Sequence, residues 1–234
     1  MRTPRSVEGL TWADLREPGT TLVVPLGSLE QHGHHLPLDT DSALAVHLAA
    51  TLCTARPTLV LAPVLPYGAS GEHEGFPGTV SIGHEALELV LVELGRSASR
   101  WASRLLVVNG HGGNVAALAA AVERLRYEGR DAASWTAGWR TGDSHAGRTE
   151  TSLMLALRPD SVRLAHAVPG ATEPLGELMP RLRADGVSAV SPSGVLGDPT
   201  GASAAEGIAL LAEMAVRLGA AVDAWLAAGA PVPR

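Results

Sequence analysis

Histidine and carboxylate side chains that could bind metal ions gather in the segment LGSLEQHGHHLPLDTD, residues 26–41. Glu30 and His32 are two positions apart, so on an extended backbone their side chains point the same way and could grip one metal ion or flank a pair. Asp41 precedes a helix-like run. It could complement the free N–H groups of that helix or, if a preceding residue caps it, remain free for binding. His34 and His35 are expected to be loop or surface histidines.

A second candidate is the turn NGHGGN, residues 109–114, between a strand-like and a helix-like run. Its glycines permit a close backbone approach, and the helix that follows offers free N–H donors. A phosphate cradle would explain the glycines as well as a metal site does. A tight turn has no structural need of an imidazole, however, and His111 stands at its centre.

The third segment, DSHAGRTETS, places His145 and Glu150 five residues apart. Glu150 could have a purely structural role, because a carboxylate is favourable in the first turn of a helix that Thr149 would cap. Mixed Glu, Asp and His ligands suit Zn, Mn or Fe(II) without selecting among them. A metal-bound water could attack an amide carbonyl, and His145 could carry a proton to the departing nitrogen.

The segments that must position these groups alternate in character along the chain. Strand-like runs at 20–25, 58–62, 104–108 and 132–135 are followed by helix-like runs at 42–55, 85–101, 115–128 and 150–157. Two further helices are expected at 175–184 and 204–226. This alternation predicts an α/β fold, a three-layer α/β/α arrangement around a mostly parallel sheet, in a single domain over residues 1–234.

In such sheets the site lies beyond the carboxyl ends of the strands. The loops 26–41, 109–114 and 140–150 each follow a predicted strand, so they should open on one edge of the sheet. Four distant side chains, Glu30, His32, Asp41 and His111, are therefore expected to meet there.

The composition limits which classes of partner the protein can bind. The 234 residues carry a net charge of -6, which argues against nucleic acid as a partner. No apolar stretch of 18 residues is present, so no membrane association is expected. The single cysteine, Cys53, fits a reducing compartment, and the expected localisation is cytoplasmic.

Five segments together resemble the creatininase family: LGSLEQHGHHLPLDTD, GEHEGFPGT, NGHGGN, HAGRTETS and GVLGDPTGAS. The resemblance runs from about Leu26 to Ala202. It implies a creatininase-like α/β fold, a homo-oligomer, often a hexamer, and two divalent metal ions (Fe, Zn or Mn). By the same resemblance, Glu30, His32, Asp41 and His111 are metal ligands, Asp41 bridges the two ions, and His145 assists proton transfer.

One position departs from creatininase itself, which has a Glu ligand where this chain has Gly113. Either one metal loses a ligand or another carboxylate replaces it, and Glu150 is the candidate. Glu72, His73 and Glu74 match no metal-binding segment of the family. They are expected to form a pocket wall or a subunit contact, with His73 the one that could touch the substrate.

Within the family, the sequence is most similar to peptidases that mature a ribosomally made precursor peptide. The likeness is carried by the segments GASGEHEGFPGTVSIG, ELGRSA, HAGRTETSLML and GVLGDPTGA. The implied reaction is hydrolysis of a Gly–Val bond, which releases a modified C-terminal Val-Tyr unit. One alternative is hydrolysis of a small amide, of the creatininase or the formylamino-pyrimidine deformylase type. A third interpretation is a non-catalytic subunit that binds an anion at NGHGGN and whose histidines are structural.

Overall fold

The centre of the molecule is a four-stranded sheet in which every neighbouring pair of strands is parallel. This computed structural model describes residues 3–16, 18–139 and 142–228. Residues 140 and 141, the start of the third predicted loop, lie outside the described residues. The strand order is β2-β1-β3-β4, with β1 at Thr21–Leu26, β2 at Leu59–Leu61, β3 at Arg104–Asn109 and β4 at Ala132–Thr136.

The strands form where short apolar runs rich in β-branched residues stand between polar loops. All six residues of β1 are buried, as are five of the six in β3. Burial on both faces explains why these strands show continuous apolar runs rather than an alternating pattern. The predicted parallel sheet is confirmed.

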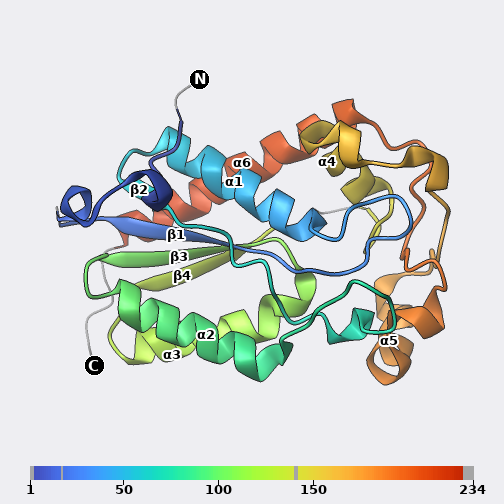
Figure 1. Ribbon diagram of the computed structural model, residues 1–234, viewed down its shortest axis with the longest axis horizontal. Helices are drawn as coiled ribbons and strands as arrows, with labels where there is room; N and C mark the ends of the chain where they lie inside the picture. The colour runs from blue at the N-terminus through green and yellow to red at the C-terminus, as the bar shows by residue number, and fades with distance from the viewer. Residues whose placement is uncertain (1–2, 17, 140–141, 229–234) are drawn as a thin grey trace.

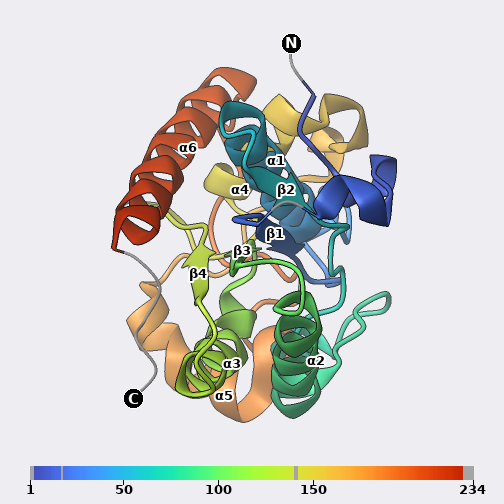
Figure 2. The same cartoon turned by 90° about the vertical axis from the view of Figure 1, so that its left-hand side faces the viewer.

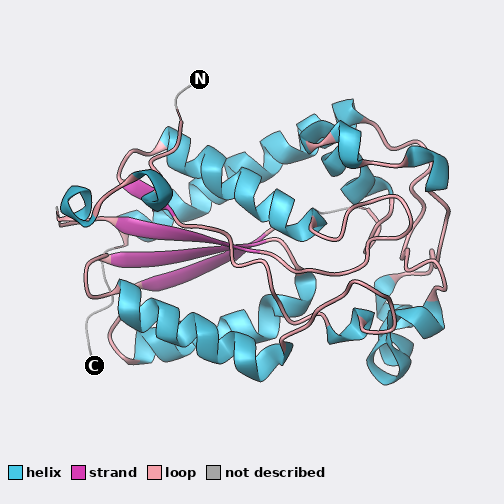
Figure 3. Ribbon diagram, viewed as in Figure 1, coloured by secondary structure: helices cyan, strands magenta, loops and turns pink. Residues whose placement is uncertain are grey.

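Helices cover both faces of the sheet (Figures 1, 2 and 3). One layer contains α1 (Thr40–Ala55), α4 (Arg148–Leu157) and α6 (Ala204–Ala227), and the other contains α2 (Gly83–Ala98) and α3 (Val115–Tyr127). Each layer forms its own buried apolar cluster with the sheet. The three-layer prediction is therefore correct. Among the helices described, none combines the length and the apolar character that crossing a bilayer requires.

Helix α5 (Leu175–Val190) lies apart from both layers, beyond the end of the sheet (Figure 1). It extends past the predicted end near Ala184, because Gly186 adopts a φ of 74° and joins two helical segments across a kink. Helix α2 ends at Ala98, earlier than the predicted Trp101, where the chain turns toward β3. The other helices and strands agree with the prediction to within a few residues.

Helices α4 and α6 approach each other closely because Gly207 has no side chain. A Cβ at Gly207 would lie 1.9 Å from the main-chain oxygen of Ser152 and 2.9 Å from the Cβ of Ala156. Polar contacts add to this packing. The Glu206 carboxylate accepts hydrogen bonds from Arg148 and from the Ser152 hydroxyl, both at 2.9 Å. Helix α6 therefore sets the position of α4.

A Gly207→Ala substitution should lower the free energy of unfolding by about 1–3 kcal/mol, because the added methyl group must push the two helix backbones apart. Gly176→Ala in α5 is the matched control, since a Cβ there meets no atom within 4 Å. The control should leave stability unchanged or raise it slightly, as alanine favours helix more than glycine does. Urea unfolding of both variants measures this. Equal stabilities would show that α4 and α6 are not held at contact by Gly207.

Candidate metal centre

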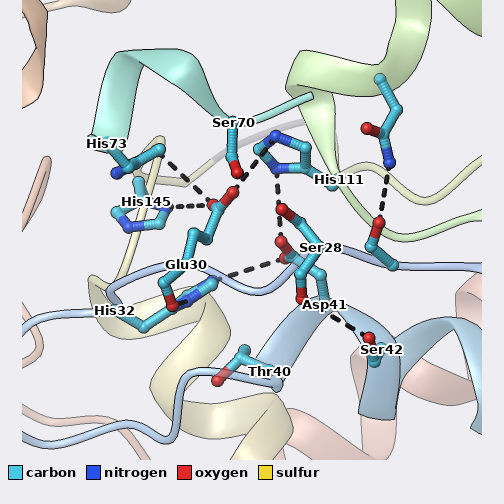
Figure 4. Close-up of polar contacts among 12 residues, drawn as sticks. Ser28, Glu30, His32, Thr40, Asp41, Ser42, Ser70, His73, His111 and His145 are labelled. Atoms are coloured by element: carbon cyan, nitrogen blue, oxygen red, sulfur yellow. Dashed lines mark hydrogen bonds and ion pairs between the residues drawn. The ribbon is translucent and has the colours of Figure 1, made fainter. Parts of the chain in front are cut away.

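The loops that follow β1 and β3 and the loop that precedes α4 meet beyond the carboxyl end of the sheet (Figure 4). Nε2 of His111 lies 3.2 Å from Oε2 of Glu30, and Nδ1 of the same ring lies 3.2 Å from Oδ2 of Asp41. Nε2 of His32 lies 3.4 Å from Oδ1 of Asp41. The expected convergence of these four distant side chains is confirmed.

The ligand atoms form overlapping groups in which every atom lies within 4.8 Å of the others. One group is Glu30, Asp41 and His111, and another is His32, Asp41 and Glu150. Asp41 belongs to both, so its carboxylate could serve two neighbouring ions. A third group joins Glu30 and His32 to His145.

These polar atoms fit a divalent cation. Glu30, His32 and Asp41 are almost wholly buried, with exposures of 0%, 0% and 2%. Both carboxylate oxygens of Glu30, Oδ2 of Asp41 and Nε2 of His32 take part in no hydrogen bond with the described residues. A buried carboxylate without a partner is costly, and a cation bound by these oxygen and nitrogen atoms removes that cost.

The cluster is strongly coupled electrostatically. Burial raises the pKa of Glu30, and the Asp41 carboxylate adds to the rise. Burial would also raise the pKa of Asp41, but His32 and His111 hold it far below its usual range. Burial alone would lower the pKa of His32, yet the nearby carboxylates, Asp41 first, raise it to about 10. The same balance holds the pKa of His111 well above its ordinary value, with Glu30 as the main opposing charge.

Both imidazoles therefore lie where positive charge can offset the buried carboxylates. A divalent cation at the same place would take over this role, because a histidine ligand must be deprotonated to bind.

Asp41 faces the cluster from the first turn of α1, although the side chain of Asp39 makes no capping hydrogen bond to the start of this helix. Asp39 occupies the N-cap position, and its carboxylate pairs with Arg158 at 2.8 Å. The Thr40 hydroxyl donates to the main-chain oxygen of Pro37 at 2.7 Å. Asp41 lies in the first turn, where the helix dipole favours negative charge. The alternative left open by the sequence, in which Asp41 only serves the helix, does not match its contacts.

Glu150 occupies the first turn of α4, and its Oε2 accepts a hydrogen bond from the Ala146 N–H at 2.6 Å. The same oxygen lies 3.8 Å from Nε2 of His32. Burial raises the pKa of Glu150 to about 7, against the opposing charge of His32. Glu150 is thus both part of the helix start and part of the cluster, which combines the two roles that the sequence left open.

The glycine turn is shaped for contact with α1. A Cβ at Gly110 would lie 2.3 Å from the main-chain oxygen of Asp41, so glycine permits the turn to pack against this helix. The Asn109 side chain closes the turn by accepting from the His111 N–H at 3.2 Å and donating to the His111 oxygen at 2.7 Å. Because His111 faces two carboxylates, an anion here would meet negative charge. The anion-binding interpretation is not favoured.

His73 lies closer to the cluster than the sequence indicated. It is buried in a 3-10 turn, Gly71–His73, and its Nε2 lies 3.5 Å from Oε1 of Glu30. Burial, together with the charges of His32 and His111, lowers the pKa of His73 to about 3. Its spacing in the sequence resembles no ligand motif. The only available signal was an imidazole between two glutamates in the glycine-rich loop after β2.

The remaining acidic and histidine side chains near the cluster, Glu72, Glu74, His34 and His35, differ in how far they are buried. Oε1 of Glu72 lies 3.7 Å from Nε2 of His111, and Glu74 is exposed. His34 is exposed in its loop, as expected. His35 is buried, and its Nε2 lies 2.9 Å from the Thr151 hydroxyl, away from the cluster.

A cavity of about 1340 Å³ opens onto the cluster. Asp41, His111, His145 and Glu150 line one wall, and Glu72 and His73 also contribute. Helix α5 also lines the cavity, with apolar residues (Leu175, Met179, Leu182 and Val187) and polar ones (Arg183, Asp185 and Ser188). The cavity thus brings apolar residues of α5 and the polar cluster into one space.

The sequence profile of the creatininase family, described as creatinine amidohydrolase, matches residues 8–222. In a solved structure described as "Creatininase Mn", the likeness covers 94% of this chain and 97% of that one, with a TM-score of 0.80 and 28% identity. The shared fold is the one that the sequence predicts.

Two curated relatives show where the likeness is strong. The chain is 60% identical over 198 residues to the mycofactocin precursor peptide peptidase of Mycolicibacterium smegmatis, which covers 82% of this chain and 80% of the relative. It is 33% identical to the creatinine amidohydrolase of Pseudomonas putida, covering 73% of this chain and 79% of the relative. The chain therefore belongs to the creatininase family and is a hydrolase.

Proposed function

We propose that this hydrolase is a metal-dependent peptidase that cleaves a Gly–Val bond in the mycofactocin precursor peptide and releases its modified C-terminal Val-Tyr unit. The observation that carries the proposal is the buried cluster in which Asp41 joins two sets of ligand atoms at the floor of a large cavity. The much higher identity to the peptidase than to the creatinine amidohydrolase supports the peptide substrate.

In this proposal two ions, Fe, Zn or Mn, are held by five side chains. Glu30, Asp41 and His111 would hold one, and His32, Asp41 and Glu150 the other, with Asp41 shared. Divalent ions at these positions supply an acidified water and polarise the peptide carbonyl. The chain contributes a site that is shielded from bulk water, since each of the five residues is at most 7% exposed.

His145 is proposed to carry the proton. Its Nε2 lies 2.8 Å from the main-chain oxygen of Gln31, so Nε2 donates and Nδ1 retains a lone pair. Nδ1 lies 3.8 Å from Oε1 of Glu30 and 4.0 Å from Oε2 of Glu150. Burial, with the charges of His32 and His73, lowers the pKa of His145 well below its ordinary value, so the ring is neutral near pH 7. Nδ1 can then accept a proton and pass it to the departing nitrogen.

The cavity supports a peptide rather than a small amide. The apolar residues of α5 that line it, Leu175, Met179 and Leu182 among them, can cover the valine and tyrosine side chains of the peptide. A cyclic or formylated small amide would leave most of a 1340 Å³ cavity unfilled.

The proposal also includes a cytoplasmic, homo-oligomeric enzyme. Cys53 is a free, buried thiol, which suits a reducing compartment. Ile208 and Val216 on α6 are 61% and 72% exposed, and contact between copies would cover them.

Mass spectrometry tests the substrate. The purified enzyme is incubated separately with the modified precursor peptide, creatinine and a formylamino-pyrimidine. We expect cleavage of the peptide alone, at the Gly–Val bond, because only the peptide fills the space beside both the polar cluster and the apolar residues of α5. Hydrolysis of either small amide with no peptide cleavage would transfer the assignment to that substrate class.

His111→Ala and His145→Ala separate metal binding from proton transfer. His111→Ala should lose bound metal and all hydrolysis, because it removes a ligand from a buried site. His145→Ala should retain the metal and lower kcat by about 10²–10⁴, the usual contribution of general acid–base catalysis. Metal analysis of protein purified without chelator, together with kinetics, measures both. Full activity in His111→Ala would contradict the assignment. If no divalent metal copurifies with the protein or restores its activity, the result would favour the interpretation as a non-catalytic binding subunit.

Gly113→Ala tests how closely the turn packs on its histidine. A Cβ at Gly113 would lie 2.4 Å from the main-chain oxygen of Ala69, 2.4 Å from Nε2 of His111 and 2.7 Å from Oε1 of Glu72, so both the turn and the imidazole must shift. We expect reduced metal content and about a tenfold loss of activity or more. Gly112→Ala, in the same turn, is the control, since its Cβ would meet no atom within 4 Å. Unchanged metal content in both variants would show that the ring tolerates displacement.

A further inference from the structure

The side chain of Gln31 lies between two histidines at the back of the cluster and is 5% exposed. Its Nε2 lies 2.8 Å from Nδ1 of His73, 3.0 Å from Nε2 of His145 and 3.0 Å from the main-chain oxygen of Gly194. The two imidazole rings stack beside it with their centroids 4.4 Å apart. One amide therefore contacts two of the three imidazoles that border Glu30, those of His73 and His145.

Main-chain groups determine which way this amide points. Oε1 of Gln31 accepts from the Gly33 N–H at 2.8 Å, while the nitrogen faces the Gly194 carbonyl. Exchanging the oxygen and the nitrogen would set two donors against each other at Gly33 and two acceptors at Gly194. The slot is also tight, since a Cβ at Gly194 would lie 1.9 Å from Oε1. The NH₂ group must therefore face the histidines.

Hydrogen-bond counting then determines where each ring carries its proton. The amide has two hydrogens, and three acceptors surround it. Nε2 of His145 also lies 2.8 Å from the main-chain oxygen of Gln31, and no other donor in the described part of the chain reaches that oxygen. If His145 donates there, the two amide hydrogens serve the Gly194 oxygen and Nδ1 of His73, and the 3.0 Å contact between the amide nitrogen and Nε2 of His145 carries no hydrogen bond. Any other assignment leaves a buried main-chain oxygen without a donor, which costs about 1–3 kcal/mol.

We propose that Gln31 is a positioning residue that holds both histidines as the neutral Nε2–H tautomer. For His73, the side-chain amide occupies Nδ1, so the Nε2–H points toward Oε1 of Glu30 at 3.5 Å. For His145, the main-chain carbonyl occupies the Nε2–H, so the Nδ1 lone pair faces Glu30 and Glu150. Oε1 of Glu30 is thus bordered by one N–H donor and one lone pair, each on a defined atom.

This arrangement gives the buried Glu30 carboxylate a hydrogen-bond donor without adding positive charge. A doubly protonated His73 would direct an Nδ1–H against the amide hydrogens of Gln31. With Nδ1 accepting from this amide, the Nε2–H of His73 can support the Glu30 charge. The role in hydrolysis rests on the proposed function, whereas the assignment of the two tautomers does not.

Nitrogen NMR of histidine-labelled, zinc-loaded enzyme tests the assignment directly, because protonated and unprotonated ring nitrogens differ in chemical shift. We expect the proton on Nε2 in both His73 and His145. A proton on Nδ1 of His73, on both of its nitrogens, or in exchange between them would overturn the proposal. His35, which is buried against Thr151 away from Gln31, provides an internal reference.

Gln31→Glu keeps the shape of the side chain but replaces the NH₂ donor by an acceptor. His73 should then carry its proton on Nδ1, and its Nε2 lone pair would oppose Glu30. His145 should keep its tautomer, because the main-chain carbonyl that orients it is unchanged. With zinc content retained, kcat should fall about 10- to 100-fold with KM unchanged, as is usual for a residue that orients ligands. An unchanged His73 tautomer in a folded variant would refute the proposal.

Thr79→Val is the matched control. The Thr79 hydroxyl accepts from the main-chain N–H of Gln31 at 3.1 Å, so this variant removes an anchor of the same residue and leaves its amide in place. Both histidines should keep the proton on Nε2, and a change of tautomer here would count against the amide as the cause. If both tautomers are as assigned and the enzyme cleaves no peptide, the proposed function fails while the positioning role of Gln31 stands.

Discussion

The structure depends on burying negative charge at the end of a parallel sheet. Glu30 and Asp41 are removed from water together with the imidazoles of His32 and His111, and neither carboxylate completes its hydrogen bonds within the described chain. Such a group of charges is stable only when positive charge is delivered at short range. Protonated histidines can supply it, and a divalent cation supplies it in a form that also activates water. Under the proposed function, the exchange between these two states would connect the fold to catalysis.

The parallel sheet makes this burial possible. Strands β1 and β3 are neighbours in register, from Thr21 opposite Arg104 to Leu26 opposite Asn109, so the loops after them begin side by side. The absence of side chains at Gly27 and Gly110 then allows both loops to contact the start of α1, where added Cβ atoms would lie 2.1 Å from the Ser42 hydroxyl oxygen and 2.3 Å from the Asp41 main-chain oxygen. The backbone geometry, rather than any single ligand, brings the charges together.

Much of this could be predicted from the sequence because it is encoded locally. Alternating strand-like and helix-like runs indicate the layers, and the rule that parallel strands end at one edge brings Glu30, His32, Asp41 and His111 together. The contribution of His73 could not be predicted in this way. Its burial depends on a short 3-10 turn that packs against the kinked helix α5, and neither feature has a periodic signature. Gln31 was missed for a similar reason, since its partners at Gly194 and His145 are more than a hundred residues away.

The contact between α4 and α6 limits which substitutions the sequence of α6 can accept. Glu150 stands on α4 two residues before Ser152, whose main-chain oxygen abuts Gly207, and α6 is otherwise a helix with much of its surface in solvent. Substitutions on the face of α6 that packs against α4 should therefore displace the Glu150 carboxylate, whereas those at exposed positions are limited only by the proposed contact between copies at Ile208 and Val216. Tolerance to replacement along α6 should therefore follow the orientation of each position rather than its distance from the cavity.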